Sequence, residues 1–160
     1  MTTLFFGKYR GKVKNNQDPM KMGRLELSVP SVLGDVTSSW AMPCVPFAGD
    51  GVGFFAIPPV NANVWVEFEG GQPDYPIWTG CFWDSGKMPL PSADAKVKLI
   101  KTDSATITFD DELGSLTIET SQGMKVTLDS KGIDLGNAAG GSIKLTGSKV
   151  SINDGALEVI

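Results

Sequence analysis

One short pattern fills the last third of the chain: Leu116-Thr-Ile-Glu, Val126-Thr-Leu-Asp, Ile133-Asp-Leu-Gly, Ile143-Lys-Leu-Thr, Val150-Ser-Ile-Asn and Leu157-Glu-Val-Ile. Each unit sets an apolar, a polar and again an apolar residue in succession, and Gly, Ser, Asp or Asn occurs between the units. Alternation with a period of two is typical of a β-strand buried on one face and wet on the other. The residues between the units favour turns. Residues 96–160 are therefore predicted to be a run of short strands.

These strands carry too few apolar side chains to build a core within one chain. Repeats of this kind bury their apolar face by stacking on neighbours. A single-chain β-solenoid, several copies sharing one core, and an ordinary meander or barrel edge are the alternatives. The units lack aromatic layers and the longer period of a solenoid coil, which favours an intertwined homo-oligomer. The residues expected to face its axis are Ile107, Leu116, Ile118, Val126, Leu128, Ile133, Leu135, Ile143, Leu145, Val150 and Ile152.

The composition indicates a folded all-β protein. The chain has 160 residues, of which 41% are hydrophobic and 20% charged, with 19 Gly and 10 Pro between short apolar runs. No run is long enough to span a membrane, and the N-terminus lacks a signal-peptide pattern, so we expect synthesis in the cytoplasm. Cys44 and Cys81 are expected to be buried, reduced thiols.

The chain contains no histidine, which removes the commonest general base and the commonest metal ligand. A Ser-His-Asp arrangement is therefore impossible, and no phosphate loop or dinucleotide fingerprint occurs. The acidic run from Asp110 to Glu112 lies in a turn and is interpreted as solvated. We expect no enzyme activity, no cofactor and no metal site.

Residues 1–84 are predicted to form a small closed barrel of the OB type, because five or six short strands occur there without a helical period. Residues 85–95 are rich in Pro and small residues and are interpreted as a linker to the strand repeats of residues 96–160. All four Trp and seven of the eight Phe precede this linker. The linker therefore separates an aromatic-rich unit from an aromatic-poor one.

Two other functions are compatible with parts of the sequence. An OB barrel with an oligomerising tail is the alternative, and it would bind nucleic acid through one basic patch with aromatic rings. The candidate residues of this patch are Lys8, Arg10, Lys12, Lys14, Lys21 and Arg24, together with Phe6 and Tyr9. The net charge of −4 argues against this and favours a solvated face or an acidic partner. A glycan-binding fibre would need exposed aromatic rings, and the repeats contain only Phe109.

Residues 23–84 carry a further set of motifs: Gly23-Arg-Leu-Glu-Leu-Ser-Val-Pro, Ser39-Trp-Ala-Met-Pro, Gly49-Asp-Gly-Val-Gly-Phe-Phe-Ala-Ile-Pro-Pro-Val, Val64-Trp-Val-Glu-Phe-Glu-Gly-Gly-Gln-Pro-Asp-Tyr-Pro and Ile77-Trp-Thr-Gly-Cys-Phe-Trp. In order and spacing, this segment resembles the OB-fold domain of the contractile-tail central spike family. That family includes phage baseplate assembly protein V, the spike of the T4 tail and the VgrG proteins of type VI secretion.

The resemblance implies an OB barrel followed by an intertwined triple-stranded β-helix in a homotrimer. Such a trimer is the structural spike at the centre of a baseplate, in a virion or an injection particle assembled in the host cytoplasm. Sheath contraction drives it through the target envelope. The chain resembles a short form, because no lysozyme domain separates barrel and repeats. A separate hub protein is implied, and its candidate contacts are Lys8, Arg10, Lys12, Lys14 and the loops around Gly34 and Gly49.

The C-terminal end departs from part of the family. Some short spikes end in a His-x-His apex that binds iron, whereas this chain ends in Leu157-Glu-Val-Ile. Such an apolar end is compatible with docking a separate tip protein of the PAAR type. The candidate docking residues are Leu157, Val159 and Ile160.

Overall fold

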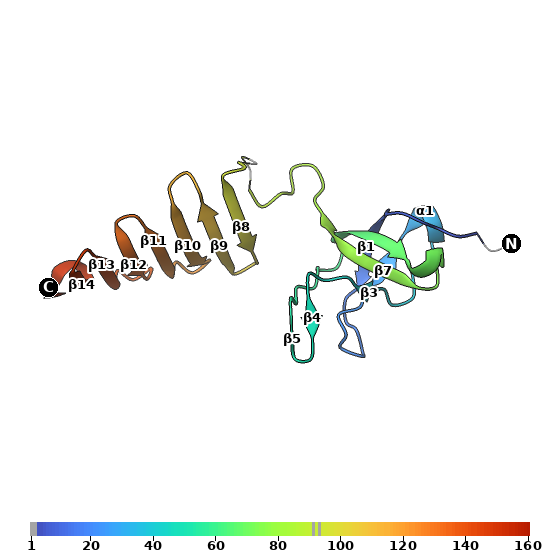
Figure 1. The fold of residues 1–160 in the computed structure, drawn as a ribbon, viewed down its shortest axis with the longest axis horizontal. Helices are drawn as coiled ribbons and strands as arrows, with labels where there is room; N and C mark the ends of the chain where they lie inside the picture. The colour runs from blue at the N-terminus through green and yellow to red at the C-terminus, as the bar shows by residue number, and fades with distance from the viewer. Residues whose placement is uncertain (1–2, 91, 93) are drawn as a thin grey trace. The chain divides into compact units, whose positions relative to one another are not determined.

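The strands of the chain belong to two separate units. The computed structural model describes residues 3–90, 92 and 94–160, and it divides into Met1–Met88 and Pro89–Ile160. The boundary falls within the predicted linker 85–95, of which residues 91 and 93 lie outside the described residues. Each unit is described by itself (Figure 1).

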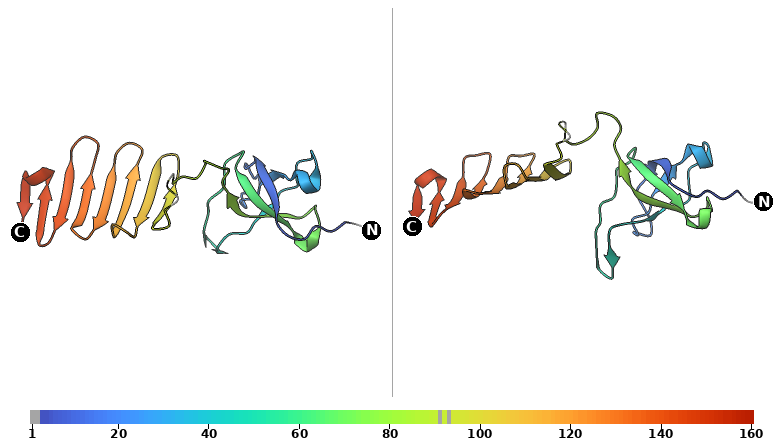
Figure 2. Two further views of the ribbon diagram at one scale, coloured as in Figure 1. Left: turned by 90° about the horizontal axis from the view of Figure 1, so that it is seen from above. Right: turned by 45° about the horizontal axis from the view of Figure 1, so that its top comes forward.

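The first unit is a curled five-stranded sheet. Its strands are β1 (Tyr9–Asn15), β2 (Glu26–Ser28), β3 (Met42–Pro43), β6 (Asn63–Phe68) and β7 (Pro76–Phe82), in the order β2-β1-β6-β7-β3. Neighbours are antiparallel except β3 and β7, which are parallel. Single bridges from Leu25 to Ala41 and from Ser28 to Thr37 bring the two ends of the sheet together. The sheet therefore closes into a small barrel (Figures 1 and 2).

Apolar side chains at alternate positions of the strands fill the interior of this barrel. In β6, Val64, Val66 and Phe68 are buried, while Trp65 and Glu67 face outward. The buried apolar residues of the unit are Val13, Leu25, Leu27, Val29, Ala41, Val64, Val66, Phe68 and Trp78. The indole Nε1 of Trp78 donates a hydrogen bond to the carbonyl oxygen of Gly23 at 3.1 Å, so its polar atom is paired as well.

The loop between β1 and β2 is held by one carboxylate. Asp18 accepts hydrogen bonds from the backbone N–H groups of Met20, Met22 and Arg24, and from the Arg24 guanidinium, with Nη2 2.7 Å from Oδ1. The Asp18 side chain is 4% exposed. The Arg24 guanidinium hydrogen bond holds the pKa of Asp18 well below its usual range, and the backbone bonds lower it further.

Three short elements complete the first unit. The helix α1 (Pro30–Leu33) begins with a proline, and the turn η1 (Glu69–Gly71) follows β6. The hairpin of β4 (Ala48–Gly49) and β5 (Val52–Gly53) reverses at Asp50-Gly51, a sequence typical of tight hairpin turns.

The prediction that both cysteines are buried is wrong. Cys44 and Cys81 are free thiols, and both are exposed. Cys44 follows the short strand β3, and Cys81 lies where a bulge between Val64 and Val66 shifts the register of β6 against β7. Both cysteines thus lie near the end of a strand, outside the buried core.

The second unit is a single antiparallel meander. Its strands are β8 (Val97–Lys101), β9 (Ala105–Asp110), β10 (Ser115–Thr120), β11 (Lys125–Asp129), β12 (Gly132–Gly136), β13 (Ser142–Thr146), β14 (Lys149–Ile152) and β15 (Leu157–Val159). Each strand pairs with its neighbour in sequence (Figure 2). The turn η2 (Asn153–Gly155) joins the last two strands. The all-β prediction is confirmed, and no helix of the described residues is long and apolar enough to cross a membrane.

Candidate functional site

From β9 to β15, the apolar side chains of the strand centres lie on one face of the sheet, and Ile100 continues this face onto β8. Residues directly opposite each other in an antiparallel pair share a face, so the register of the strands defines continuous rows. One row contains Ile100, Ile107, Ile118, Val126, Leu135, Ile143, Ile152 and Leu157. The second row contains Phe109, Leu116, Leu128, Ile133, Leu145, Val150 and Val159. We call these two rows the apolar face.

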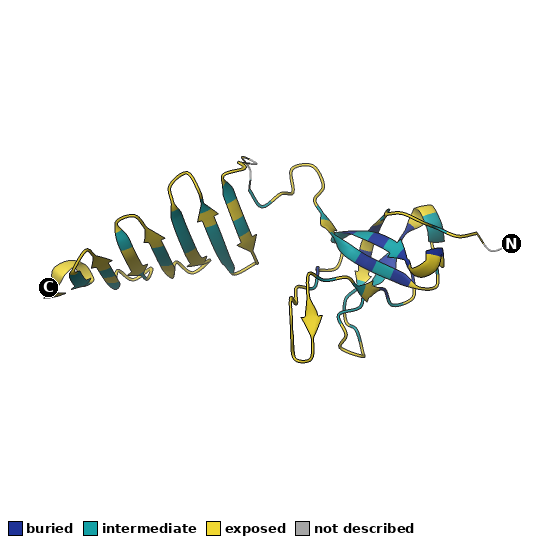
Figure 3. Ribbon diagram, in the orientation of Figure 1, coloured by how far each residue is buried: buried dark blue, intermediate teal, exposed yellow. Residues whose placement is uncertain are grey.

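The apolar face has no cover within one chain. No residue from 94 to 160 is buried, and side chains in the middle of the face, such as Ile118 and Ile143, are 42% and 41% exposed. Buried residues occur on the strands of the first unit and not on those of the second (Figure 3). A contiguous apolar surface of this extent marks an interface with another protein chain.

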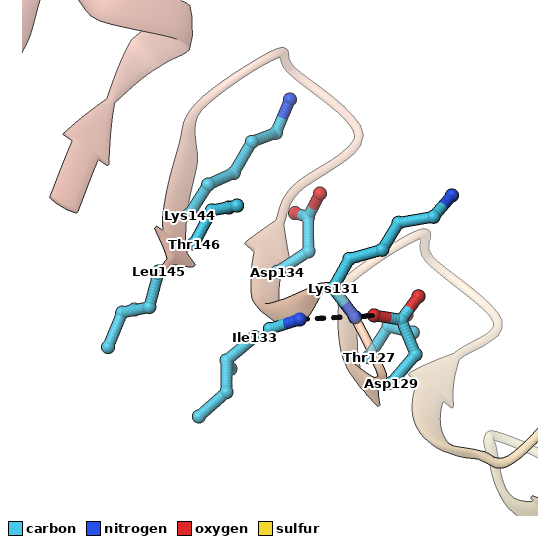
Figure 4. A pocket seen from close by; sticks show the side chains of 9 residues that line it. Thr127, Asp129, Lys131, Ile133, Asp134, Lys144, Leu145 and Thr146 are labelled. Carbon is cyan, nitrogen blue, oxygen red and sulfur yellow. Dashed lines mark hydrogen bonds between the residues drawn. The ribbon is translucent and has the colours of Figure 1, made fainter. Parts of the chain in front are cut away.

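The opposite face of the same sheet is polar. The register aligns Thr108, Thr117, Thr127, Asp134, Lys144, Ser151 and Glu158 across it. Figure 4 shows Asp134, Lys144 and Thr146 on this side, while Ile133 and Leu145 point the other way. Ion pairs on this face join Lys144 to Asp154 and Lys149 to Glu158. The hydrogen bond from Lys144 to Asp154 raises the pKa of Lys144.

A shallow hollow of about 380 Å³ lies on the polar face between β11, β12 and β13 (Figure 4). Its charged lining residues are Asp129, Lys131, Asp134 and Lys144, two of each sign, so the hollow has little net charge. The described residues contain no group of three or more His, Cys, Asp or Glu that could hold a metal ion. The hollow is therefore part of a solvated surface, and the apolar face is the stronger candidate for function.

The turns between strands fix the register that creates the two faces. Asp129 accepts hydrogen bonds from the N–H groups of Lys131 and Gly132 at 2.8 and 3.2 Å, and Asn137 accepts from Gly141 at 2.8 Å. Gly132 has φ +146°, and a Cβ at this position would lie 1.8 Å from the carbonyl oxygen of Leu145. Only glycine fits there, because the neighbouring strand is already in contact with its Cα.

All eleven residues predicted for the shared axis lie in the two rows of the apolar face. The sequence reasoning missed Ile100 and Phe109, which extend the rows onto β8 and β9. Alternation from Ile107 would have found Phe109. The two predicted tip-docking residues Leu157 and Val159 continue the same rows on β15, and Ile160 follows this strand with 93% of its surface exposed.

The predicted hub contacts lie along the outer side of β1 and just before it. Arg10, Lys12 and Lys14 alternate with the buried Gly11 and Val13. The Arg10 guanidinium carbon lies 5.1 Å from the centre of the Trp65 ring and 4.9 Å from that of Phe82.

These two rings pack against each other with centroids 4.7 Å apart and their planes tilted by 39°. Lys8 pairs with Glu67 at 2.6 Å. The structure thus adds Trp65 and Phe82 to this basic surface, an association across strands that sequence spacing could not reveal.

Comparison with known families separates the same two parts of the chain. Residues 9–83 match the family model of the type VI secretion system/phage-baseplate injector OB domain. Residues 96–158 match the model of the phage baseplate V C-terminal trimerisation domain. The two matches confirm the OB assignment of the barrel, and the apolar face lies almost entirely within the trimerisation match. No curated protein matches the chain.

Proposed function

Because the chain belongs to the phage baseplate V family and carries its injector OB and trimerisation domains in that order, we propose that it is the central spike of a contractile injection machine. Three copies join through the trimerisation domain, and contraction of the sheath drives the trimer through the target envelope. The observation that carries this proposal is the apolar face of the second unit, which stays exposed in a single chain.

Trimerisation buries this face around a common axis. Three sheets that turn their apolar faces inward enclose a three-sided core, and their polar faces remain in water. Burial of one aliphatic side chain contributes about 1.5–3 kcal/mol, and each copy adds two rows of such side chains. The eight strands pair consecutively within one chain. Each copy therefore contributes one complete set of backbone hydrogen bonds to the proposed triple-stranded β-helix. Eight strands at a spacing of about 4.8 Å span roughly 35 Å along the axis.

The lengths of the strands support a needle that narrows toward its end. The strands have six residues in β9 and β10, four in β14 and three in β15. At about 3.4 Å per residue, the width of each sheet decreases from roughly 20 to roughly 10 Å. Continuous backbone ladders give stiffness along the axis, and the Thr, Lys and Asp side chains outside keep the needle in solution.

Two partners complete the proposed spike. A hub protein contacts the basic surface of Lys8, Arg10, Lys12 and Lys14, where guanidinium and ammonium groups favour an acidic partner. A PAAR-like tip protein covers the C-terminal end. The last strand, β15, has a neighbour on one side only, so its free N–H and C=O groups are open to another chain. Ile160 adds an exposed apolar anchor there. The role is mechanical, without catalysis.

The mass of the purified chain tests the basis of this proposal. Multi-angle light scattering is expected to give three times the chain mass of 17.0 kDa. A monomer would contradict the proposal directly. Immunogold labelling of particles purified from producing cells tests the location, with label expected at the tail tip. Label along the tube would exclude a central spike.

A further inference from the structure

The first strand of the second unit departs from the pattern of the other seven. In β8, Lys98 lies opposite Phe109 and therefore shares the apolar face, whereas Leu99 lies opposite Thr108 and shares the polar face. Of the charged residues in the described strands β8–β15, Lys98 alone is on the apolar face. The apolar face thus begins with one cation, at the end that follows the linker.

This cation has a carboxylate beside it. Asp111 follows β9 and continues the alternation of Ile107 and Phe109, and Lys98 donates a hydrogen bond to it. The side chains of Lys98 and Asp111 are 56% and 61% exposed. An ammonium group carries three donors and a carboxylate about four acceptor sites, so each group can bind a further partner. We call Lys98 and Asp111 the charged level.

The two apolar rows by themselves define poorly how far each copy is shifted along the common axis. Their members are aliphatic at every level except at Phe109. Strands β8 to β13 have five or six residues each. Shifting one sheet by one strand, about 4.8 Å, would set aliphatic side chains against aliphatic side chains again. A charged group at one level removes this ambiguity, because a shift moves the charge into apolar surroundings.

We propose that Lys98 of one copy pairs with Asp111 of the next copy, and that this ring of charges sets the register in which the three sheets assemble. This inference rests on the homotrimer of the proposed function. Contacts around a threefold axis are heterologous, so each copy must offer two different, complementary groups. The ammonium group on β8 and the carboxylate after β9 are such a pair. A copy shifted by one strand would instead set its Lys98 against the apolar level of Phe109.

The charged level contributes specificity rather than affinity. A buried ion pair is often no more stabilising than apolar side chains of the same size, whereas a buried charge without a partner is costly. The apolar rows therefore hold the three copies together, and the charged level disfavours the shifted arrangements. Its position at the end of the rows keeps the cost of desolvation low, because water reaches the end of the core.

Exchanging the charges between two versions of the full-length chain tests whether the pair forms across copies. Lys98→Asp has only carboxylates at this level, and Asp111→Lys has only ammonium groups. Each version alone is expected to dissociate at a protein concentration at least about ten-fold higher than the wild type, measured by light scattering. The two versions are then mixed in equal amounts, with one of them isotopically labelled, unfolded and refolded. Native mass spectrometry should find both versions in more than about nine-tenths of the trimers.

Lys101→Asp and Asp110→Lys are the matched controls, because they lie on the same two strands but on the polar face. These versions should associate like the wild type and mix at random, which gives about three-quarters mixed trimers. Random mixing of Lys98→Asp with Asp111→Lys, when the wild type scatters as a trimer, would overturn the ring of charges and leave the spike proposal standing. A monomeric wild type would overturn both.

A neutral variant measures the register itself. Lys98→Met combined with Asp111→Asn removes both charges and should keep the trimer mass. A p-benzoylphenylalanine in place of Phe109 keeps the aromatic ring and reports which residues of the neighbouring copy lie at its level. The two-chain crosslinks of the otherwise wild-type chain should lie mainly in β9. In the neutral variant, the share of crosslinks displaced to β8 or β10 should rise at least about three-fold. The same distribution in both chains would overturn the role in register.

Discussion

The two units of this protein bury their apolar side chains in different ways. In the barrel, Leu27 and Val64 are fully buried within one chain. In the eight-stranded sheet, the equivalent inward positions, such as Ile143 and Leu145, remain about 40% exposed. Both units use the same alternation of apolar and polar residues. The difference shows that a closed sheet forms its own core, whereas an open one with a single apolar face depends on other copies.

The largest expected effect is on the sheet. Ile143→Asp places a carboxylate in the middle of the apolar face, and three of them meet at one level of the trimer. Burial of unpaired charges is costly enough to prevent association. Light scattering is expected to show loss of the trimer at micromolar concentration.

Ser151→Asp is the matched control for this substitution. Ser151 lies on the polar face between Lys144 and Glu158, where an added carboxylate remains in water. This variant should keep the mass of the wild-type trimer. A robust trimer of the Ile143→Asp variant would show that the apolar face is not the interface.

A core truncation in the barrel has a large but local effect. Leu27→Ala removes a fully buried side chain and should lower the free energy of unfolding of the first unit by about 2–5 kcal/mol. Tryptophan fluorescence in urea reports on this unit alone, because all four Trp precede the linker. Val36→Ala, at a side chain that is 67% exposed, should change this free energy by less than about 0.5 kcal/mol. Dissociation of the Leu27→Ala trimer would contradict the independence of the two units.

A smaller effect is expected at the turn before β12. Gly132→Ala would place Cβ 1.8 Å from the Leu145 carbonyl oxygen at φ +146°, so β12 and β13 must move apart. The cost should exceed about 1 kcal/mol in trimer stability, measured by thermal unfolding at matched protein concentration. Gly136→Ala, in the same strand and with no atom within 4 Å of the added Cβ, should be nearly neutral. Equal stability of the two variants would disprove the close approach of the strands.

The smallest effect concerns pH and the barrel. Because the pKa of Asp18 is lower in the folded chain than its unfolded value of about 3.9, its carboxylate stabilises the fold above pH 4. That contribution is lost as the pH falls through the folded pKa.

Unfolding of the wild type and of Asp18→Asn in urea, compared from pH 6 to pH 2, measures this contribution. The wild type should be more stable at pH 6, and the difference should shrink toward pH 2. The exposed Asp35→Asn serves as the control and should show a much smaller difference. A difference for Asp18→Asn that is independent of pH would mean that its carboxylate charge does not hold the loop.

Part of the structure could not be read from the sequence because it depends on pairing. The hairpin exists only because the Asp50-Gly51 turn folds Val52–Gly53 back onto Ala48–Gly49. The exposed cysteines were mispredicted because both lie near strand ends, Cys44 just after β3 and Cys81 one residue before the end of β7. Trp65 and Phe82 lie next to Arg10 only because of the register in which β1, β6 and β7 pair.

The sequence by itself determined which side chains of residues 96–160 share a face. The period of two is a property of the extended backbone, so Ile118 and Val126 could be assigned to one face before any pairing was known. Only the tertiary structure decided that eight strands pair consecutively and form two unbroken apolar rows. Register depends on the turns, such as the one at Gly132, and on contacts between distant residues. That pairing left the apolar face without cover in one chain and made it the surface on which three copies are proposed to meet.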